Sequence, residues 1–203
     1  VSTFLNSAQS VDANLGQLQS QASQQINGDV TTLNSLLQQI SKLNASIPQA
    51  SLSSGDATGV QDQQNHLVNQ LSSLMGVNVQ ATATGGVTIR SIDGAYLAGD
   101  QGAATVAFSQ SGSAAVLTAS PPSGGAQQIN PGGGDIGGQI QLSQVELPQI
   151  SAQLGEYVSQ AVNQLNQASN ASSAVPAPST LTGQAMGMAL STAVSGFSGK
   201  TTI

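Results

Sequence analysis

Apolar residues recur at steps of three and four through the first quarter of the chain. The positions are Phe4, Ala8, Val11, Leu15, Leu18, Ala22, Ile26, Val30, Leu33, Leu37, Ile40 and Ile47. This period predicts an amphipathic helix over residues 2–46, about 65 Å long, which Pro48 ends. Two consecutive steps of four around Gly28 predict a weak point near residues 24–30. A helix with so long an apolar face needs a partner.

Two further helices are predicted in the same way. Residues 49–58 are small and polar and predict a loop, after which a second helix begins near Thr58 and stops at Gly76. A third, long helix is predicted over residues 138–169. Pro148 lies inside it, so we expect a kink there or a separate first piece.

Between these helices the period of the apolar residues changes from helical to two, which indicates strands. Gly-Gly and Asp-Gly pairs at residues 85–86 and 93–94 are typical of turns. We therefore expect a small antiparallel sheet inserted at about residues 77–118, followed by a Pro/Gly-rich loop over 119–134. The predicted strands lie at residues 77–79, 87–89, 96–97, 104–108 and 114–118.

The fold class that these elements indicate is α+β, mainly α. Long antiparallel helices form a rod-like bundle, and a small antiparallel β-hairpin or sheet is inserted into it. We expect a helical rod domain over residues 1–170, a linker over 171–183, and the truncated start of a following β-rich domain over 184–203. Val1 begins inside a periodic segment, which suggests an excised fragment.

Charge and cysteine content narrow the possible functions. Charged residues make up only 6% of the chain, the net charge is −6, and there are three Lys and Arg residues together. Binding to nucleic acid or to an anionic membrane surface needs several cations on one face, so neither partner is expected. The chain has no Cys, and its first residues have no basic region typical of a signal peptide.

Two glycine motifs resemble phosphate-binding loops only in part. Gly199-Lys200-Thr201 matches the end of such a loop, but Val194 stands where the loop needs its first Gly. The glycine cluster over residues 132–138 precedes a helix, but its local charge is Asp135 and no cation is near. A turn at the start of the helix is the better interpretation of this cluster.

The remaining candidates for chemistry lack partners. His66 is the only histidine, and Asp62 lies one helical turn before it, so a metal site would be incomplete. Asp93 and Asp100 form a conceivable carboxylate pair, but Asp93 belongs to an Asp-Gly turn. Solvated helix positions explain Glu146 and Glu156, and chance explains the two glycosylation sequons, at residues 44–46 and 170–172. We predict no catalytic, cofactor-binding or metal-binding residue, no cofactor, and no enzyme activity.

Three stretches of the chain resemble the FlgK family of flagellar hook-associated proteins, which form the first hook–filament junction. They are LNSLLQQISKLNASI (33–47), VQDQQNHLVNQLSSLMGVNV (60–79), and the block over 133–166 with a Gly-Gly turn, Leu147-Pro148 and Gln153-Leu154-Gly155. The chain departs from the family pattern at Gln64-Asn65, where Arg and Asp are common, and near Val145-Glu146, where an Arg-Asp pair is common. These departures remove charge and put family salt bridges at those places in doubt.

The resemblance implies a structural and non-enzymatic protein. Such a protein is exported by the flagellar type III apparatus without a cleaved signal and assembles outside the cell. It forms a ring with copies of itself, between the hook protein and the second junction protein. This chain resembles the middle of the family, without its axial termini, and we therefore expect the fragment to be monomeric on its own. We expect the uncharged Gln and Ser faces to mate between subunits. The alternative is a secreted coiled-coil adhesin or surface-binding module, which would share the low charge and the lack of Cys.

Overall fold

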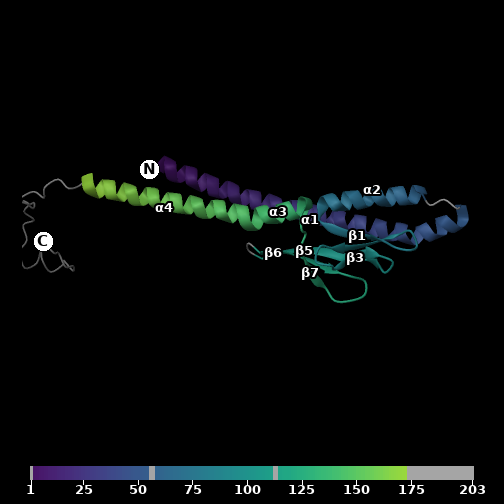
Figure 1. Ribbon diagram of the computed structural model, residues 1–203. Helices are drawn as coiled ribbons and strands as arrows, with labels where there is room; N and C mark the ends of the chain where they lie inside the picture. The colour runs from purple at the N-terminus through teal and green to yellow at the C-terminus, as the bar shows by residue number, and fades with distance from the viewer. Residues whose placement is uncertain (1, 55–57, 112–113, 173–203) are drawn as a thin grey trace, which may run out of the picture. The chain divides into compact units, whose positions relative to one another are not determined.

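The computed structural model describes residues 2–54, 58–111 and 114–172 (Figure 1). The chain divides into two compact units, Val1–Gln160 and Ala161–Ile203. Within the described ranges the second unit contains only the last part of helix α4. The predicted linker and following domain lie almost wholly outside the described residues, so the predicted division into domains stays a prediction.

Helix α1 runs from Ser2 to Ser54 and passes through Pro48. The predicted end at Pro48, and the predicted loop after it, are therefore wrong as far as Ser54. A proline inside a helix removes one backbone hydrogen bond and costs about 3 kcal/mol. Tertiary contacts next to Pro48 offset this cost. Ile47 is fully buried, and the side chain of Asn44 makes three buried hydrogen bonds.

Helix α2 (Thr58–Leu74) lies alongside the second half of α1 and contacts it (Figure 1). Its start confirms the helix predicted near Thr58, and its end lies two residues before Gly76. One side of the helix is buried, and its buried residues are Gln64, Leu67, Leu71 and Leu74.

The strands form two antiparallel sheets, whereas the sequence predicted one. The first sheet has the order β1-β2-β3-β4, with strands Val77–Ala81, Val87–Ser91, Tyr96–Gly99 and Gly102–Ala103. The second has the order β5-β6-β7, with strands Thr105–Ser111, Ala114–Ser120 and Gln127–Ile129. Val79 pairs with Ile89, which confirms the predicted hairpin. The β structure extends beyond residue 118 because β7, within the Pro/Gly-rich segment, pairs with β6.

The predicted long helix consists of three consecutive pieces. They are α3 (Gly134–Gln141), a π-helical turn (Leu142–Glu146) and α4 (Leu147–Ser172). In the π-turn the Leu147 N–H donates to the carbonyl of Leu142, five residues back. Pro148 follows at once and cannot donate to the carbonyl of Gln144. The interruption predicted at Pro148 is thus present, as a wide turn just before the proline.

Helix α3 begins four residues earlier than the predicted start at residue 138, because a glycine allows a close approach to α2. Gly134 has a φ of 70°, and a Cβ added there would lie 2.6 Å from the carbonyl carbon of Leu74. Only glycine fits such a contact. The glycine cluster therefore forms a turn that sets the position of α3, as the sequence indicated.

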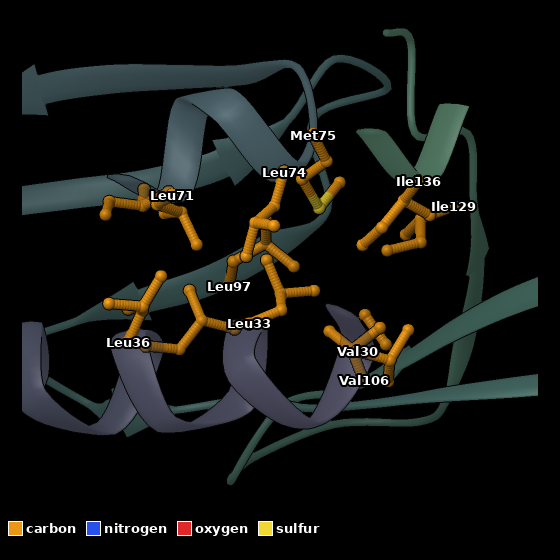
Figure 2. Packing of buried hydrophobic residues seen from close by; sticks show 14 of the residues in the cluster. Val30, Leu33, Leu36, Leu71, Leu74, Met75, Leu97, Val106, Ile129 and Ile136 are labelled. Atoms are coloured by element: carbon orange, nitrogen blue, oxygen red, sulfur yellow. The ribbon is translucent and has the colours of Figure 1, made fainter. Parts of the chain in front are cut away.

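The hydrophobic core lies where the second half of α1, α2, α3 and the two sheets meet (Figure 2). The labelled side chains in Figure 2 show how many elements contribute: Val30, Leu33 and Leu36 of α1, Leu71 and Leu74 of α2, Met75, Leu97 of β3, Val106 of β5, Ile129 of β7 and Ile136 of α3. This architecture confirms the mainly α, α+β class.

Two asparagines of α1 fix the sheets to the helix. The amide of Asn44 donates to the carbonyl of Val87 in β2 at 2.7 Å and accepts from the Val87 N–H at 2.9 Å. Asn34 makes the same pair of bonds to Val106 in β5, at 2.8 and 2.7 Å. Each asparagine side chain thus forms with one strand residue the pair of hydrogen bonds that a neighbouring strand would otherwise form. Gln64 of α2 also donates to the Asn44 carbonyl oxygen, at 2.6 Å, so this position joins three elements.

Candidate functional site

The first part of α1 continues the apolar stripe of the second part but is not covered. From Thr3 to Gln21 no side chain is buried, whereas Ala22 and Ile26 begin the packed region. Val11 and Leu18 are exposed, Leu18 by 45%. Half-buried residues of the same stripe are Phe4, Leu5, Ala8 and Leu15. An apolar stripe in this state is typical of a surface that packs against another chain or segment.

Helix α4 presents a matching open face within the first unit. Leu147 is its last buried residue, and none is buried from Pro148 to Gln160. Ile150 is 45% exposed and Tyr157 is 63% exposed. The apolar period predicted for this helix is therefore present, but most of its apolar side chains remain accessible.

The two open faces meet through a few side-chain contacts. The rings of Phe4 and Tyr157 pack edge to face with centroids 5.8 Å apart, and Ser151 Oγ donates to Asp12 Oδ1 at 3.5 Å. Early residues of α1 thus contact later residues of α4, which means that the two helices run antiparallel. A ring contact of this kind contributes only about 1 kcal/mol, so the pair is weakly held.

A groove of about 750 Å³ lies between α1 and α4 where the packed region ends. Leu15, Gly16 and Gln19 form one wall, and Leu147 and Pro148 form the other. Its lining mixes leucine side chains with amides and hydroxyls and has a single charged group, the Asp12 carboxylate. Such a groove suits the apolar side of another helix better than a small polar substrate. We call the open faces of α1 and α4 together with this groove the helical seam.

A second concave region lies on the first sheet. It is a cleft of about 410 Å³ between strands β2 and β3 on one side and the β6–β7 loop on the other. Arg90 and Tyr96 stand opposite each other in the register of the two strands, and the guanidinium carbon lies 6.0 Å from the ring centroid. Burial raises the pKa of Tyr96 above its ordinary value, and the hydrogen bond from Gln101 opposes this shift.

The structure places the two candidate carboxylates in different surroundings. Asp93 Oδ2 accepts the backbone N–H of Asn130 at 2.6 Å, as a turn residue does. Asp100 lines the cleft near Arg90, whereas Asp93 lines a different cavity. His66 and Asp62 are both exposed on α2. Within the described ranges, no three His, Asp or Glu side chains come together in a way that would hold a metal ion.

The structure also gives the positions of the candidate glutamates and of the two sequon asparagines. Glu146 and Glu156 are exposed and accept hydrogen bonds from Gln141 and Gln160, which lie five and four residues away along the chain. The sequon residue Asn44 is buried between helix and sheet, where it holds Val87 and is inaccessible to modification. Asn170 is exposed on α4, and Gly199-Lys200-Thr201 lies outside the described residues. In the described part of the chain no helix is both long and apolar enough to cross a membrane.

The sequence did not predict the contacts of Asn34 and Asn44 with the two sheets, which we call the asparagine clamps. It also did not predict the cleft lined by Arg90 on the first sheet, which we call the Arg90 cleft. Both depend on pairings distant in the chain, Asn34 with Val106 and Arg90 with the β6–β7 loop, for which a local pattern carries no signal. A usable clue existed for the cleft. In a chain with so few cations, an arginine directly after a predicted strand is unusual enough to be examined as a binding residue.

Comparison with known proteins gives a consistent family assignment. The model of the "Flagellar hook-associated protein FlgK helical domain" family matches residues 1–185. A solved structure of the flagellar hook junction protein FlgK from Burkholderia pseudomallei matches with a TM-score of 0.57 and 24% identity. The match covers 65% of this chain and 25% of that chain, so the matched part of this chain spans about a quarter of that protein's length. No match was found among curated proteins.

The match to the solved structure shows a shared fold, and the family model extends over most of the chain. The alternative interpretation as an adhesin or surface-binding module is not favoured by these matches. The chain belongs to the family of the helical domain of the flagellar hook-associated protein FlgK.

Proposed function

We propose that the protein to which this chain belongs is a structural subunit of the extracellular bacterial flagellum. In this proposal it forms the hook–filament junction by subunit packing, next to the hook protein and the second junction protein, and catalyses no reaction. The observation that carries the proposal is the helical seam. It is an extended apolar surface on regular helices, left open by the rest of the described chain.

The composition of the helical seam favours packing against another subunit over catalysis. The seam has aliphatic and aromatic side chains at helical spacing, amide and hydroxyl groups beside them, and few charges. Burying an exposed leucine or valine contributes about 1.5–3 kcal/mol, so a seam with several such residues can stabilise an assembly. The sequence had suggested the Gln and Ser faces for this role. The exposed apolar stripe is the stronger candidate, and the polar residues then supply specificity at its rim.

The test places charges on the seam in the full-length protein. We expect Val11→Asp with Leu18→Asp to remove the protein from isolated hook–filament junctions, because two carboxylates would have to be buried without partners. Asn6→Asp with Ala13→Asp is the matched control: it adds the same charge at the same spacing on the opposite side of α1, where both residues are exposed.

The measurement is the amount of protein in purified junctions relative to the amount secreted into the medium. Loss of the seam variant with retention of the control supports the proposal. Equal incorporation of both variants would show that the seam is not an assembly surface. Absence of the unmodified protein from the junctions would contradict the proposed role itself.

A further inference from the structure

The Arg90 cleft is built on the outer face of the first sheet. Along β2 the side chains of Val87, Ile89 and Ser91 are buried, while Arg90 between them is exposed. Because successive side chains of a strand point to opposite faces, Arg90 points away from the core that α1 covers. The β6–β7 loop forms the other wall of the cleft.

Hydrogen bonds and close packing hold the two walls in place. Tyr96 Oη donates to the carbonyl of Gly102 at 2.8 Å and accepts the Gln101 N–H at 3.2 Å. Ser123 of the loop donates to the Gln101 side chain at 3.1 Å. Gly102, with a φ of 101°, lies so close to Pro122 that an added Cβ would be 3.2 Å from the Pro122 Cγ. The shape of the cleft is therefore set before anything binds.

The two charged groups of the cleft have unused binding capacity. Within the described residues Arg90 makes one hydrogen bond, from Nη1 to the carbonyl of Gly94 at 3.0 Å, and its guanidinium carbon lies over the Tyr96 ring. A guanidinium has five N–H donors, so several remain for a ligand. Asp100 lines the same cleft, and its side chain makes no ion pair with Arg90 and no hydrogen bond to the described part of the chain.

The net charge of the chain indicates which kind of group the Arg90 guanidinium would contact in an assembly of several copies. The net charge is −6, so copies packed side by side repel one another unless the few cations are used. In the described part of the chain the cations are Lys42 and Arg90. The exposed carboxylates of the same part are more numerous: Asp12, Asp62, Asp93, Asp100, Asp135, Glu146 and Glu156.

We propose that the Arg90 cleft is a subunit contact that receives a carboxylate side chain from a second copy of this chain. The donor set fits the group, because a guanidinium binds a carboxylate through two parallel hydrogen bonds. Asp100, on the same wall, accepts a hydrogen bond from an amide or hydroxyl next to the incoming carboxylate. The acidic residues of this chain have such neighbours, as in Gln61-Asp62-Gln63.

This inference rests on the proposed function, since it needs copies of the chain to assemble. It differs from the helical seam in location and in chemistry. The seam supplies apolar area on α1 and α4, and the cleft supplies a charged, directional contact on the sheet. Contacts of the second kind mainly determine register and choice of partner.

The test reverses the charge of the cleft in the full-length protein. We expect Arg90→Glu to lower the amount of protein in purified junctions about tenfold, with secretion unchanged. Lys42→Glu is the matched control, because it makes the same charge change at an exposed residue outside the cleft. It should change incorporation less than twofold. Arg90→Lys keeps the charge without the paired donors and should give an intermediate loss, which also guards against misfolding of the Glu variant.

A second arm identifies the incoming group. In the Arg90→Glu background, every acid of the chain except the buried Asp29 and the cleft residue Asp100 is changed to Arg, one at a time, and one of these changes should restore incorporation. The residues changed are Asp12, Asp56, Asp62, Asp93, Asp135, Glu146 and Glu156. Normal incorporation of Arg90→Glu, or a defect that none of the seven changes restores, would overturn the inference. If the unmodified protein is missing from junctions, the proposed function fails instead, and the two failures are thereby distinguished.

Discussion

The two parts of α1 have similar sequences and very different surroundings. Both carry apolar residues at steps of three and four, and both are otherwise rich in Gln, Ser and Asn. From Ala22 to Ile47 this stripe is buried against α2, α3 and both sheets, whereas from Thr3 to Gln21 no side chain is buried. The periodic pattern thus determines which side of a helix is apolar. What covers that side depends on the rest of the assembly.

The largest expected effect comes from truncating the same residue type in the two parts. Leu33→Ala removes a fully buried side chain and should lower the free energy of unfolding by about 3–4 kcal/mol. Leu18→Ala removes one that is 45% exposed and should cost less than about 1 kcal/mol. Urea unfolding followed by circular dichroism measures both. Similar losses would mean that the first part of α1 is packed as firmly as the second.

Polar residues also differ between the packed and the open part of α1, and the asparagine clamps belong to the packed part. Asn44→Ala leaves the N–H and carbonyl of Val87 and the amide of Gln64 without their buried partner. We expect a loss of about 2–3 kcal/mol in the free energy of unfolding. Asn6→Ala, at an exposed position on the open part, is the control and should change it by less than about 0.5 kcal/mol. A loss below about 1 kcal/mol for Asn44→Ala would show that water replaces the amide.

The π-turn is where the packed region passes into the open face of α4. Pro148→Ala restores a backbone donor within reach of the Gln144 carbonyl and should raise the free energy of unfolding by about 1 kcal/mol. The exposed neighbour Gln149→Ala serves as a control for helix propensity. Denaturant unfolding of the two variants gives the difference. A marked destabilisation by Pro148→Ala would instead show that the proline is needed to hold the turn.

The smallest effect is a pH dependence confined to the packed region. Burial raises the pKa of Tyr96, so its folded-state value lies above the unfolded value near 10. The resulting stabilisation is fully present below about pH 10 and is lost as pH rises through the folded value. Tyr96→Phe should remove this alkaline dependence in thermal unfolding. A Tyr96→Phe variant that keeps the full alkaline dependence would contradict the assignment.

Local patterns predicted the helices and the first hairpin because their signals lie within a few turns or strands. They failed at Pro48, where the burial of Ile47 and the bonds of Asn44 outweigh a strong helix-ending residue. They also missed β7, since Gln127–Ile129 is too short to show alternation and is a strand only by pairing with β6.

The candidate site was predictable to a similar extent. The stripes that form the seam were visible in the sequence, including the open one on α1. The cleft was not, because the β6–β7 loop that completes it is more than thirty residues from Arg90 along the chain. Residues this far apart along the chain are brought together only by the fold, so a local sequence pattern does not predict their contact.

The most direct test of the central claim is thiol labelling of the helical seam in assembled junctions. The chain has no Cys, so in a full-length protein whose cysteines outside this chain, if any, are replaced, single cysteines at Leu18 and at Ala13 report on the two sides of α1. In purified junctions the Leu18→Cys thiol should be protected from a maleimide, while the Ala13→Cys thiol should react. Equal reaction of the two thiols in assembled junctions would contradict the claim that the open part of α1 is an assembly surface.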